Sequence, residues 1–146
     1  MTRSDLVDAF QNFSFHMMHY REKVMKAFDL SFIEMLIVTY LKKKGPTKLS
    51  KLASLAGLTK PTITHLIDGL EARGFVKREP DQNDRRVILV TTGRECEKMF
   101  TTFESINSDF MKAINELDEN TAERVKEMVN RLTEYLSKRV EEDKNE

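Results

Sequence analysis

The sequence has few of the residues that mark disulfide-rich, fibrous or metal-caged proteins. It contains one cysteine, no tryptophan, five glycines and three prolines in 146 residues. A single cysteine cannot form a bridge within the chain or supply several zinc-binding thiolates. The scarcity of glycine and proline excludes a collagen-like or low-complexity chain. What remains is an ordinary globular composition, with 40% hydrophobic and 33% charged residues.

Long apolar segments are also missing. No run approaches the roughly 20 residues that a membrane span needs, and the charged N-terminal residues do not resemble a signal peptide. We therefore expect a cytoplasmic protein without membrane contact. The sequence also lacks a nucleophile with an adjacent base, a glycine-rich phosphate loop and a pair of carboxylates in a cleft context. It is predicted not to be an enzyme and to carry no cofactor.

The length predicts a single folded unit. A chain of 146 residues can bury roughly 68–70% of its unfolded surface and is too short for two ordinary domains. No internal repeat or long linker divides it. We predict one domain over residues 1–146.

The net charge of zero conceals a separation of charge along the chain. Residues 1–41 carry a net charge of −1, residues 42–94 carry +7 and residues 95–146 carry −6. A basic middle between neutral and acidic ends favours one surface that binds a polyanion. A chance cluster of solvated lysines is the alternative, and charge alone does not decide between them.

The N-terminal segment has the apolar spacing of one amphipathic helix. Ser4 is a candidate N-cap, with Asp5 near the positive end of the helix dipole. The stripe is too broad to be left in water. Its apolar residues alternate at steps of four and three, at Leu6, Phe10, Phe13, Met17, Tyr20 and Val24.

Two further helices are predicted before residue 58. Ser31 and Glu34 form a capping box, and the helix that they open ends at Gly45. Thr47 is predicted to cap a short third helix that ends at Gly57.

A fourth helix follows directly. Thr59 is its predicted N-cap, with a proline in the first turn, and Gly74 closes it. Its core-facing residues lie at helical spacing, at Ile63, Leu66, Ile67 and Leu70.

The hydrophobic period changes from 3.6 to 2 after this helix. Residues 75–79 and 86–91 are predicted to form a two-stranded ribbon, with turn-forming residues at 80–85 between the strands. Thr92 and Glu95 form another capping box, which predicts a fifth helix with an apolar stripe that continues to Ile114. A last helix follows a turn at residues 117–120, and its apolar side is Val125, Met128, Val129, Leu132 and Leu136.

Helices joined by a glycine turn and followed by a ribbon give the element order of a winged helix-turn-helix. The predicted fold is mainly α, with a winged part of order α-α-α-β-β at residues 31–91. N- and C-terminal dimerisation helices flank it at residues 4–28 and 93–141. One winged part cannot cover three further apolar stripes, so we expect two chains to pair through them. A monomeric helical bundle is the alternative.

The fourth helix and the ribbon carry side chains that suit DNA. With its apolar face buried, the helix presents a lysine, Thr62, Thr64 and His65 outward, where hydroxyl and imidazole groups can reach base edges and the lysine can reach phosphates. Arg85 and Arg86 leave the ribbon loop, where guanidinium groups can enter a minor groove. An architectural or adaptor protein that uses the same fold for protein contacts is the alternative function.

Three short sequences carry a family resemblance: LTKPTIT at residues 58–64, LEARGFV at 70–76 and DRR at 84–86. In this order the chain resembles the MarR (multiple antibiotic resistance regulator) family over almost its whole length. The resemblance implies a homodimeric, sequence-specific transcriptional repressor that a small ligand or oxidation releases from a pseudo-palindromic operator. It also implies that Asp84 buttresses Arg86 in the wing. The residues assigned to double-stranded DNA are Lys60, Pro61, Thr62, Thr64, His65, Arg73, Asp84, Arg85 and Arg86.

A pocket for a small aromatic or phenolic effector is predicted between the first helix and the winged part. Its expected lining is aromatic and sulfur-containing, at Phe13, Met17, Tyr20 and Phe32. Ordinary core packing is the alternative for such residues at helical spacing.

Two other features have a functional and an ordinary interpretation. His16 and His19 lie one helical turn apart but have no acidic or thiol partner at ligand spacing, so no metal site is predicted. Cys96 is either a reactive thiol in the first turn of a helix or a small buried residue.

Overall fold

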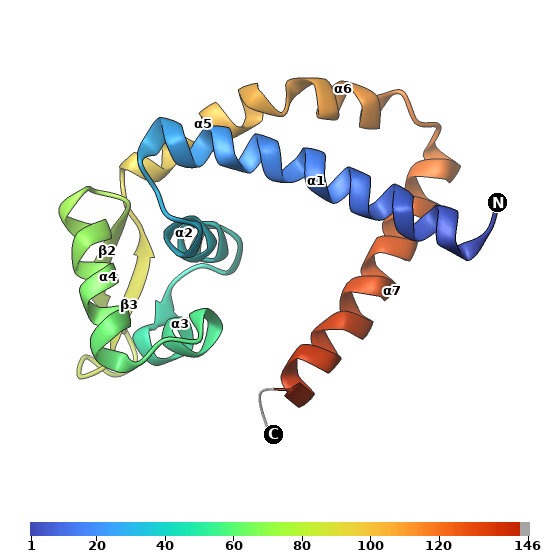
Figure 1. Cartoon of the computed structure of the whole chain (residues 1–146). Coiled ribbons are helices and arrows are strands. Elements are labelled where there is room, and N and C mark those ends of the chain that lie inside the picture. Colours follow the sequence, from blue (N-terminus) through green and yellow to red (C-terminus); the bar gives the residue numbers. More distant parts are fainter. Residues whose placement is uncertain (144–146) are drawn as a thin grey trace. The chain divides into compact units, whose positions relative to one another are not determined.

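The computed structural model describes residues 1–143, apart from the side chains of residues 140 and 141. Over this range the chain is mainly α with one small antiparallel sheet, which confirms the predicted fold class (Figure 1). It forms two compact units, Met1–Ile106 and a second that begins at Asn107. The elements are α1 (Arg3–Phe28), α2 (Phe32–Lys44), β1 (Thr47–Lys48), α3 (Leu49–Ala56), α4 (Lys60–Ala72), β2 (Val76–Pro80), β3 (Ile88–Thr92), α5 (Glu95–Ile106), α6 (Ser108–Asn115) and α7 (Glu119–Asp143).

Capping boxes open the first two helices. The N-cap of α1 is Thr2, two residues before the predicted cap: the hydroxyl of Thr2 accepts the Asp5 N–H at 3.2 Å, and the Asp5 carboxylate accepts the Thr2 N–H at 2.6 Å. The prediction of Ser4 as N-cap is therefore wrong. The box of Ser31 and Glu34 at the start of α2 is confirmed. No described helix is long and apolar enough to cross a membrane.

The segment after α2 contains a strand that the sequence did not reveal. Thr47 and Lys48 form β1, and Thr47 pairs with Val90 of β3. The Thr47 hydroxyl donates to the Gly45 carbonyl at 2.9 Å, and α3 begins at Leu49 with no side-chain cap. The prediction of a Thr47 cap is wrong, and the predicted two-stranded ribbon is a three-stranded sheet in the order β1-β3-β2.

The wing strands run antiparallel, with Val76 opposite Thr92 at one end and Pro80 opposite Ile88 at the other. Thr92 lies inside β3, so the predicted capping box with Glu95 is wrong. Helix α5 starts at Glu95, whose N–H donates to the Gly74 carbonyl at 3.0 Å.

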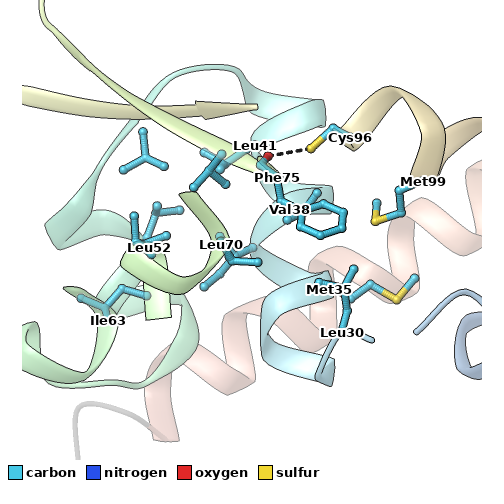
Figure 2. Packing of buried hydrophobic residues seen from close by; sticks show 14 of the residues in the cluster. Leu30, Met35, Val38, Leu41, Leu52, Ile63, Leu70, Phe75, Cys96 and Met99 are labelled. Carbon is cyan, nitrogen blue, oxygen red and sulfur yellow. Dashed lines mark hydrogen bonds between the residues drawn. The ribbon is translucent and has the colours of Figure 1, made fainter. Parts of the chain in front are cut away.

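Helices α2 to α5 and the sheet share one hydrophobic core (Figure 2). Helix α5 also packs along α1 within the first unit (Figure 1). This core fixes α4 and the wing in one body. Its most completely buried large residues are Ile37, Leu41, Leu52, Ile63, Ile67, Leu70 and Met99.

The second unit consists of α6 and α7. The fifth helix that was predicted to continue to Ile114 is instead two helices, which meet at Asn107. Asparagine and serine at 107–108 favour this break, since their side chains compete with the helical backbone hydrogen bonds. Asp118 precedes α7, where its carboxylate accepts the N–H and the hydroxyl of Thr121 at 3.0 and 2.6 Å.

Candidate nucleic-acid interface

Two threonines and a proline define the N-terminus of α4. The Thr59 hydroxyl accepts the Thr62 N–H at 3.4 Å, and the two hydroxyl oxygens lie 2.8 Å apart. Pro61 occupies the first turn, where its missing N–H costs no helical bond. The helix therefore begins sharply and directs its positive dipole end outward.

The first two turns of α4 gather the five residues predicted there. Lys60, Pro61, Thr62 and His65 are exposed. Thr64 is half-buried, because its hydroxyl donates to the Lys60 carbonyl at 2.8 Å. The Thr64 oxygen still has lone pairs that can accept a hydrogen bond. The cluster therefore offers a cation, hydroxyl groups and an imidazole on one surface.

The wing holds a bidentate ion pair. The Asp84 carboxylate accepts from Nε and Nη2 of Arg86 at 3.1 and 3.2 Å, and from the Arg86 backbone N–H at 3.1 Å. These hydrogen bonds hold the pKa of the Asp84 carboxyl below its ordinary value of 3.8. The Arg86 side chain is 91% exposed, so its charge lies at the surface while its orientation is fixed from one side.

The loop that carries this pair is internally bonded. Its backbone closes between Asp81 and Val87, where the Asp81 N–H donates to the Val87 carbonyl at 2.9 Å. The Asp81 carboxylate accepts the Asn83 N–H at 2.8 Å. Arg85 is exposed beside Arg86. The geometry places both arginines together, as the sequence predicted.

Two basic residues near this surface were missed by the sequence reasoning. Lys48, on β1, lies close enough to Asp84 for its charge to lower the pKa of that carboxyl. Arg78, on β2, lies 2.7 Å from Asp68 and 2.9 Å from Glu71, both on α4, and ties the wing to that helix. Asp68 and Glu71 share a helix face at i, i+3 spacing, which was the available signal for a basic partner.

Arg73 is separated from the other predicted residues. It follows the last residue of α4, roughly 20 Å along the helix from Lys60. Its guanidinium donates to the Phe28 carbonyl, lies 3.9 Å from Glu34 and packs over the Phe75 ring at 5.1 Å. The structure therefore brings eight of the nine predicted residues to α4's first turns and the wing, and places Arg73 elsewhere.

Comparison with known proteins relates the winged part to a protein family. The description "MarR family" matches residues 30–88, the segment that contains α4 and most of the wing. Residues 30–88 are therefore similar to the MarR family, which confirms the resemblance found in the sequence. The uncharacterized HTH-type transcriptional regulator YcgE of Bacillus subtilis is 28% identical over 102 residues, which cover 69% of this chain and 66% of YcgE. The chain spans 45% to 66% of the length of three such curated relatives.

Solved structures share the fold. A mutant of MepR from multidrug-resistant Staphylococcus aureus has a TM-score of 0.75 and 22% identity, covering 93% of this chain and 98% of that one. Another MepR mutant, solved bound to an oligodeoxyribonucleotide, has a TM-score of 0.60 and 21% identity, covering 93% and 99%. At these identities the likeness concerns the winged fold.

One small groove lies in the first unit. It has a volume of about 180 Å³, and its lining is apolar apart from one arginine and one threonine. Phe32 is the only one of the four predicted effector residues in that lining; Phe13, Met17 and Tyr20 are not part of it. The full lining is Arg21, Phe32, Met35, Leu36, Thr39, Met99, Phe100 and Phe103.

Cys96 is enclosed in the core. Only 2% of the residue is exposed, and its thiol donates to the Phe75 carbonyl at 2.8 Å (Figure 2). Burial raises the pKa of this thiol. A buried thiol with a raised pKa is a poor nucleophile, which favours the interpretation of Cys96 as a small core residue.

The two histidines of α1 lie at the surface. The His16 ring donates from Nδ1 to the Asn12 carbonyl at 2.8 Å, and the His19 ring contacts Tyr20 edge-on. Among the described residues there is no cluster of three or more histidine, cysteine or acidic side chains that suits a metal ion.

Proposed function

We propose that this protein is a sequence-specific transcriptional regulator that binds double-stranded DNA as a homodimer. The observation that carries the proposal is one composite surface. The exposed Lys60, Thr62 and His65 start α4, and Arg85 and Arg86 project from the wing, all within the segment of net charge +7. The MepR mutant bound to an oligodeoxyribonucleotide supports a nucleic acid as the partner of this fold.

The two parts of the surface read DNA in different ways. Helix α4 enters the major groove, where Thr64 and His65 face base edges and Lys60 and the helix start face phosphates. Pro61 and Thr62 lie in the first turn of α4 and fix the position of the helix start against the DNA backbone. Arg85 and Arg86 enter the minor groove, which offers its width and negative potential more than a base code. Asp84 keeps the Arg86 fork in one orientation and thereby lowers the entropy lost on binding.

Exposed apolar side chains support the dimer. Leu6, Val7 and Phe13 of α1 are 38%, 53% and 49% exposed. Helix α7 exposes a second set, and apolar surface of this extent favours association with another protein surface. Two-fold pairing predicts a pseudo-palindromic operator whose half-sites lie about 10–10.5 base pairs apart. The α7 set is Val125, Met128, Val129, Leu132, Tyr135 and Leu136.

We further propose that the protein is a repressor that a small ligand releases. The groove of about 180 Å³ suits a small aromatic or phenolic molecule, because it is apolar and contains the cationic side chain of Arg21. Its walls come from α1, α2 and α5. A ligand that prefers one arrangement of these helices shifts the population between DNA-binding and non-binding states.

A fluorescence-anisotropy titration tests DNA binding. A duplex selected from a random library and an unselected duplex are titrated with the full chain at several salt concentrations. The logarithm of the affinity should fall linearly with the logarithm of salt, with a slope of about −0.9 for each phosphate neutralised. A flat dependence would contradict DNA binding and favour the adaptor function.

Two variants separate the proposed contacts. Arg86→Ala should weaken binding to both duplexes and reduce the salt slope, because the variant has one positive charge fewer near the DNA phosphates. His65→Ala should cost roughly 1–3 kcal/mol on the selected duplex and little on the unselected one. Lys112→Ala on α6 is the matched control and should change neither. Equal losses for His65→Ala on both duplexes would rule out base recognition by this residue.

A further inference from the structure

Arg73 occupies the place where three helix termini meet. Arg73 is the C-cap of α4, and its N–H still donates to the Gly69 carbonyl at 3.2 Å. The guanidinium Nη2 donates to the carbonyl of Phe28, the last residue of α1. The last carbonyls of a helix have no partner within it, and a cation there also complements the helix dipole. Arg73 therefore satisfies the C-terminus of α1.

The same guanidinium faces the N-terminus of α2. Glu34 closes the capping box of that helix, since its Oε2 accepts the Ser31 N–H at 2.7 Å. The other oxygen, Oε1, lies 3.9 Å from Nη1 of Arg73. The side chains are only 36% and 21% exposed, so the two charges are partly shielded from solvent. One arginine thus contacts the end of α1 and the cap of α2.

Phe75 and Phe28 form an aromatic pair that packs against the Arg73 guanidinium. The guanidinium carbon lies 5.1 Å from the centroid of the Phe75 ring, within the range of a cation–π contact. Phe75 is 4% exposed, and its ring meets Phe28 edge-to-face at 6.2 Å. The guanidinium is therefore held by the Phe75 ring as well as by its hydrogen bond to the Phe28 carbonyl.

From these contacts we infer that Arg73 is a positioning residue that sets the angle between α1 and α4 and thereby the preferred spacing of DNA half-sites. The inference rests on the proposed function, in which α1 takes part in dimerisation and α4 reads DNA. Helix α1 is 26 residues long, or about 39 Å. A small rotation at its C-terminus therefore displaces α4 by several ångströms relative to the far end of α1.

A lysine at this position separates positioning from a direct phosphate contact. Lysine keeps the positive charge that a phosphate requires, but it lacks the planar fork that bonds a carbonyl, faces a carboxylate and stacks on a ring at once. Arg73→Lys should thus preserve binding if Arg73 contacts DNA, and impair it if Arg73 positions α4. Arg94→Lys, at an exposed arginine to which no DNA contact is assigned, is the matched control.

The DNA experiment uses the full chain and a duplex selected from a random library, with further duplexes whose half-sites are moved apart or together by one and two base pairs. Arg73→Lys should bind the selected duplex at least tenfold more weakly with an unchanged salt slope, and should distinguish the spacings less than the parent chain does. Arg94→Lys should retain the parent affinity and spacing preference. Parent-like affinity and spacing preference for Arg73→Lys would overturn the inference, as would a lower salt slope for Arg73→Gln with its spacing preference intact.

Hydrogen exchange without DNA gives an independent readout of the anchor. Arg73→Lys should accelerate amide exchange at residues 29–35 and 73–76, while exchange in the wing loop at residues 81–87 stays unchanged. Unaltered exchange at the junction would overturn the inference even if DNA binding were impaired. Failure of the parent chain to bind DNA in a salt-dependent way would instead refute the proposed function, and the exchange result would still decide whether Arg73 anchors the junction.

Discussion

The winged part and the C-terminal helices bury their side chains to very different degrees. The buried hydrophobic residues of the described chain all lie between Val24 and Met99. Helix α6 has none, and no described side chain of α7 is buried. Both regions have apolar stripes of similar helical spacing, so the stripes alone do not distinguish them. The difference is that the stripes of the winged part are covered within the first unit, by its own elements together with α1 and α5.

This contrast shows which apolar surfaces a single chain can bury by itself. The winged part has a closed core, and its polar groups are held by hydrogen bonds such as those of Arg78 and Asp84. The exposed stripe of α7 calls for a further surface, which we assign to a second chain.

The largest expected effect is a cavity in the winged core. Ile67 is completely buried, so Ile67→Ala should lower the free energy of unfolding by about 2–5 kcal/mol. Val129→Ala on α7, where the residue is 42% exposed, should lower it by far less at low protein concentration. Urea unfolding of both variants at micromolar concentration measures the difference. Equal losses would mean that α7 is covered within the single chain.

A smaller effect is expected where the wing meets α5. A Cβ at Gly93 would lie 2.3 Å from the Gly74 carbonyl oxygen, and the backbone there cannot yield easily. Gly93→Ala should therefore cost about 1–3 kcal/mol or more. Gly69→Ala is the control, because nothing lies within 4 Å of its added Cβ; inside α4 it should stabilise by about 0.4–1 kcal/mol. Thermal unfolding compares the two, and a harmless Gly93→Ala would contradict the close packing at this corner.

The third prediction concerns the exposed face of α7. Leu132→Glu places a charge in the stripe, where burial against a second chain would desolvate it, and should raise the dimer dissociation constant at least tenfold, or about 1.4 kcal/mol. Asn130→Glu lies on the opposite side of the helix and should leave the constant unchanged. Sedimentation equilibrium gives both values. A dimer indifferent to Leu132→Glu would exclude this face from the interface.

The smallest effect is a protonation in the wing. The pKa of the Asp84 carboxyl is lowered in the folded chain by its hydrogen bonds from Arg86. A lowered folded pKa means that the pair stabilises the wing above the ordinary value of 3.8 and that this contribution is lost as the pH falls through the folded pKa. An NMR titration should give an Asp84 pKa below its ordinary value, and Arg86→Ala should raise that pKa again. An unshifted Asp84 in the parent chain would contradict the ion pair.

Local signals explain what could be predicted from the sequence. The capping box of Ser31 and Glu34, the Thr59 cap and the closing role of Gly74 each depend on a few neighbouring residues, and all three are confirmed. The wing strands were also predicted, to within two residues at each end, from their alternation. A local signal was nevertheless misplaced at α1, where the capping box is formed by Thr2 and Asp5 and not by the predicted cap, Ser4.

Other errors arose where distant contacts decide. Strand β1 has only two residues and exists because Thr47 pairs with Val90, 43 positions later. Thr92 remains in β3 because Val76 pairs with it, so it cannot cap α5. The contacts of Arg73 and Arg78 join different elements, and although the spacing of Asp68 and Glu71 indicates a basic partner, it does not identify Arg78. Their charge was visible in the sequence, but not the direction of their contacts.

One measurement tests whether the helical part joins two chains while the winged part folds within one. Sedimentation velocity of the full chain with a selected pseudo-palindromic duplex counts the chains on each duplex, and a second duplex that keeps one half-site serves for comparison. We predict two chains on the full duplex and an affinity at least a hundredfold lower on the single half-site, since two linked contacts bind more tightly than one. One chain per duplex, with equal affinity for both DNAs, would contradict this division.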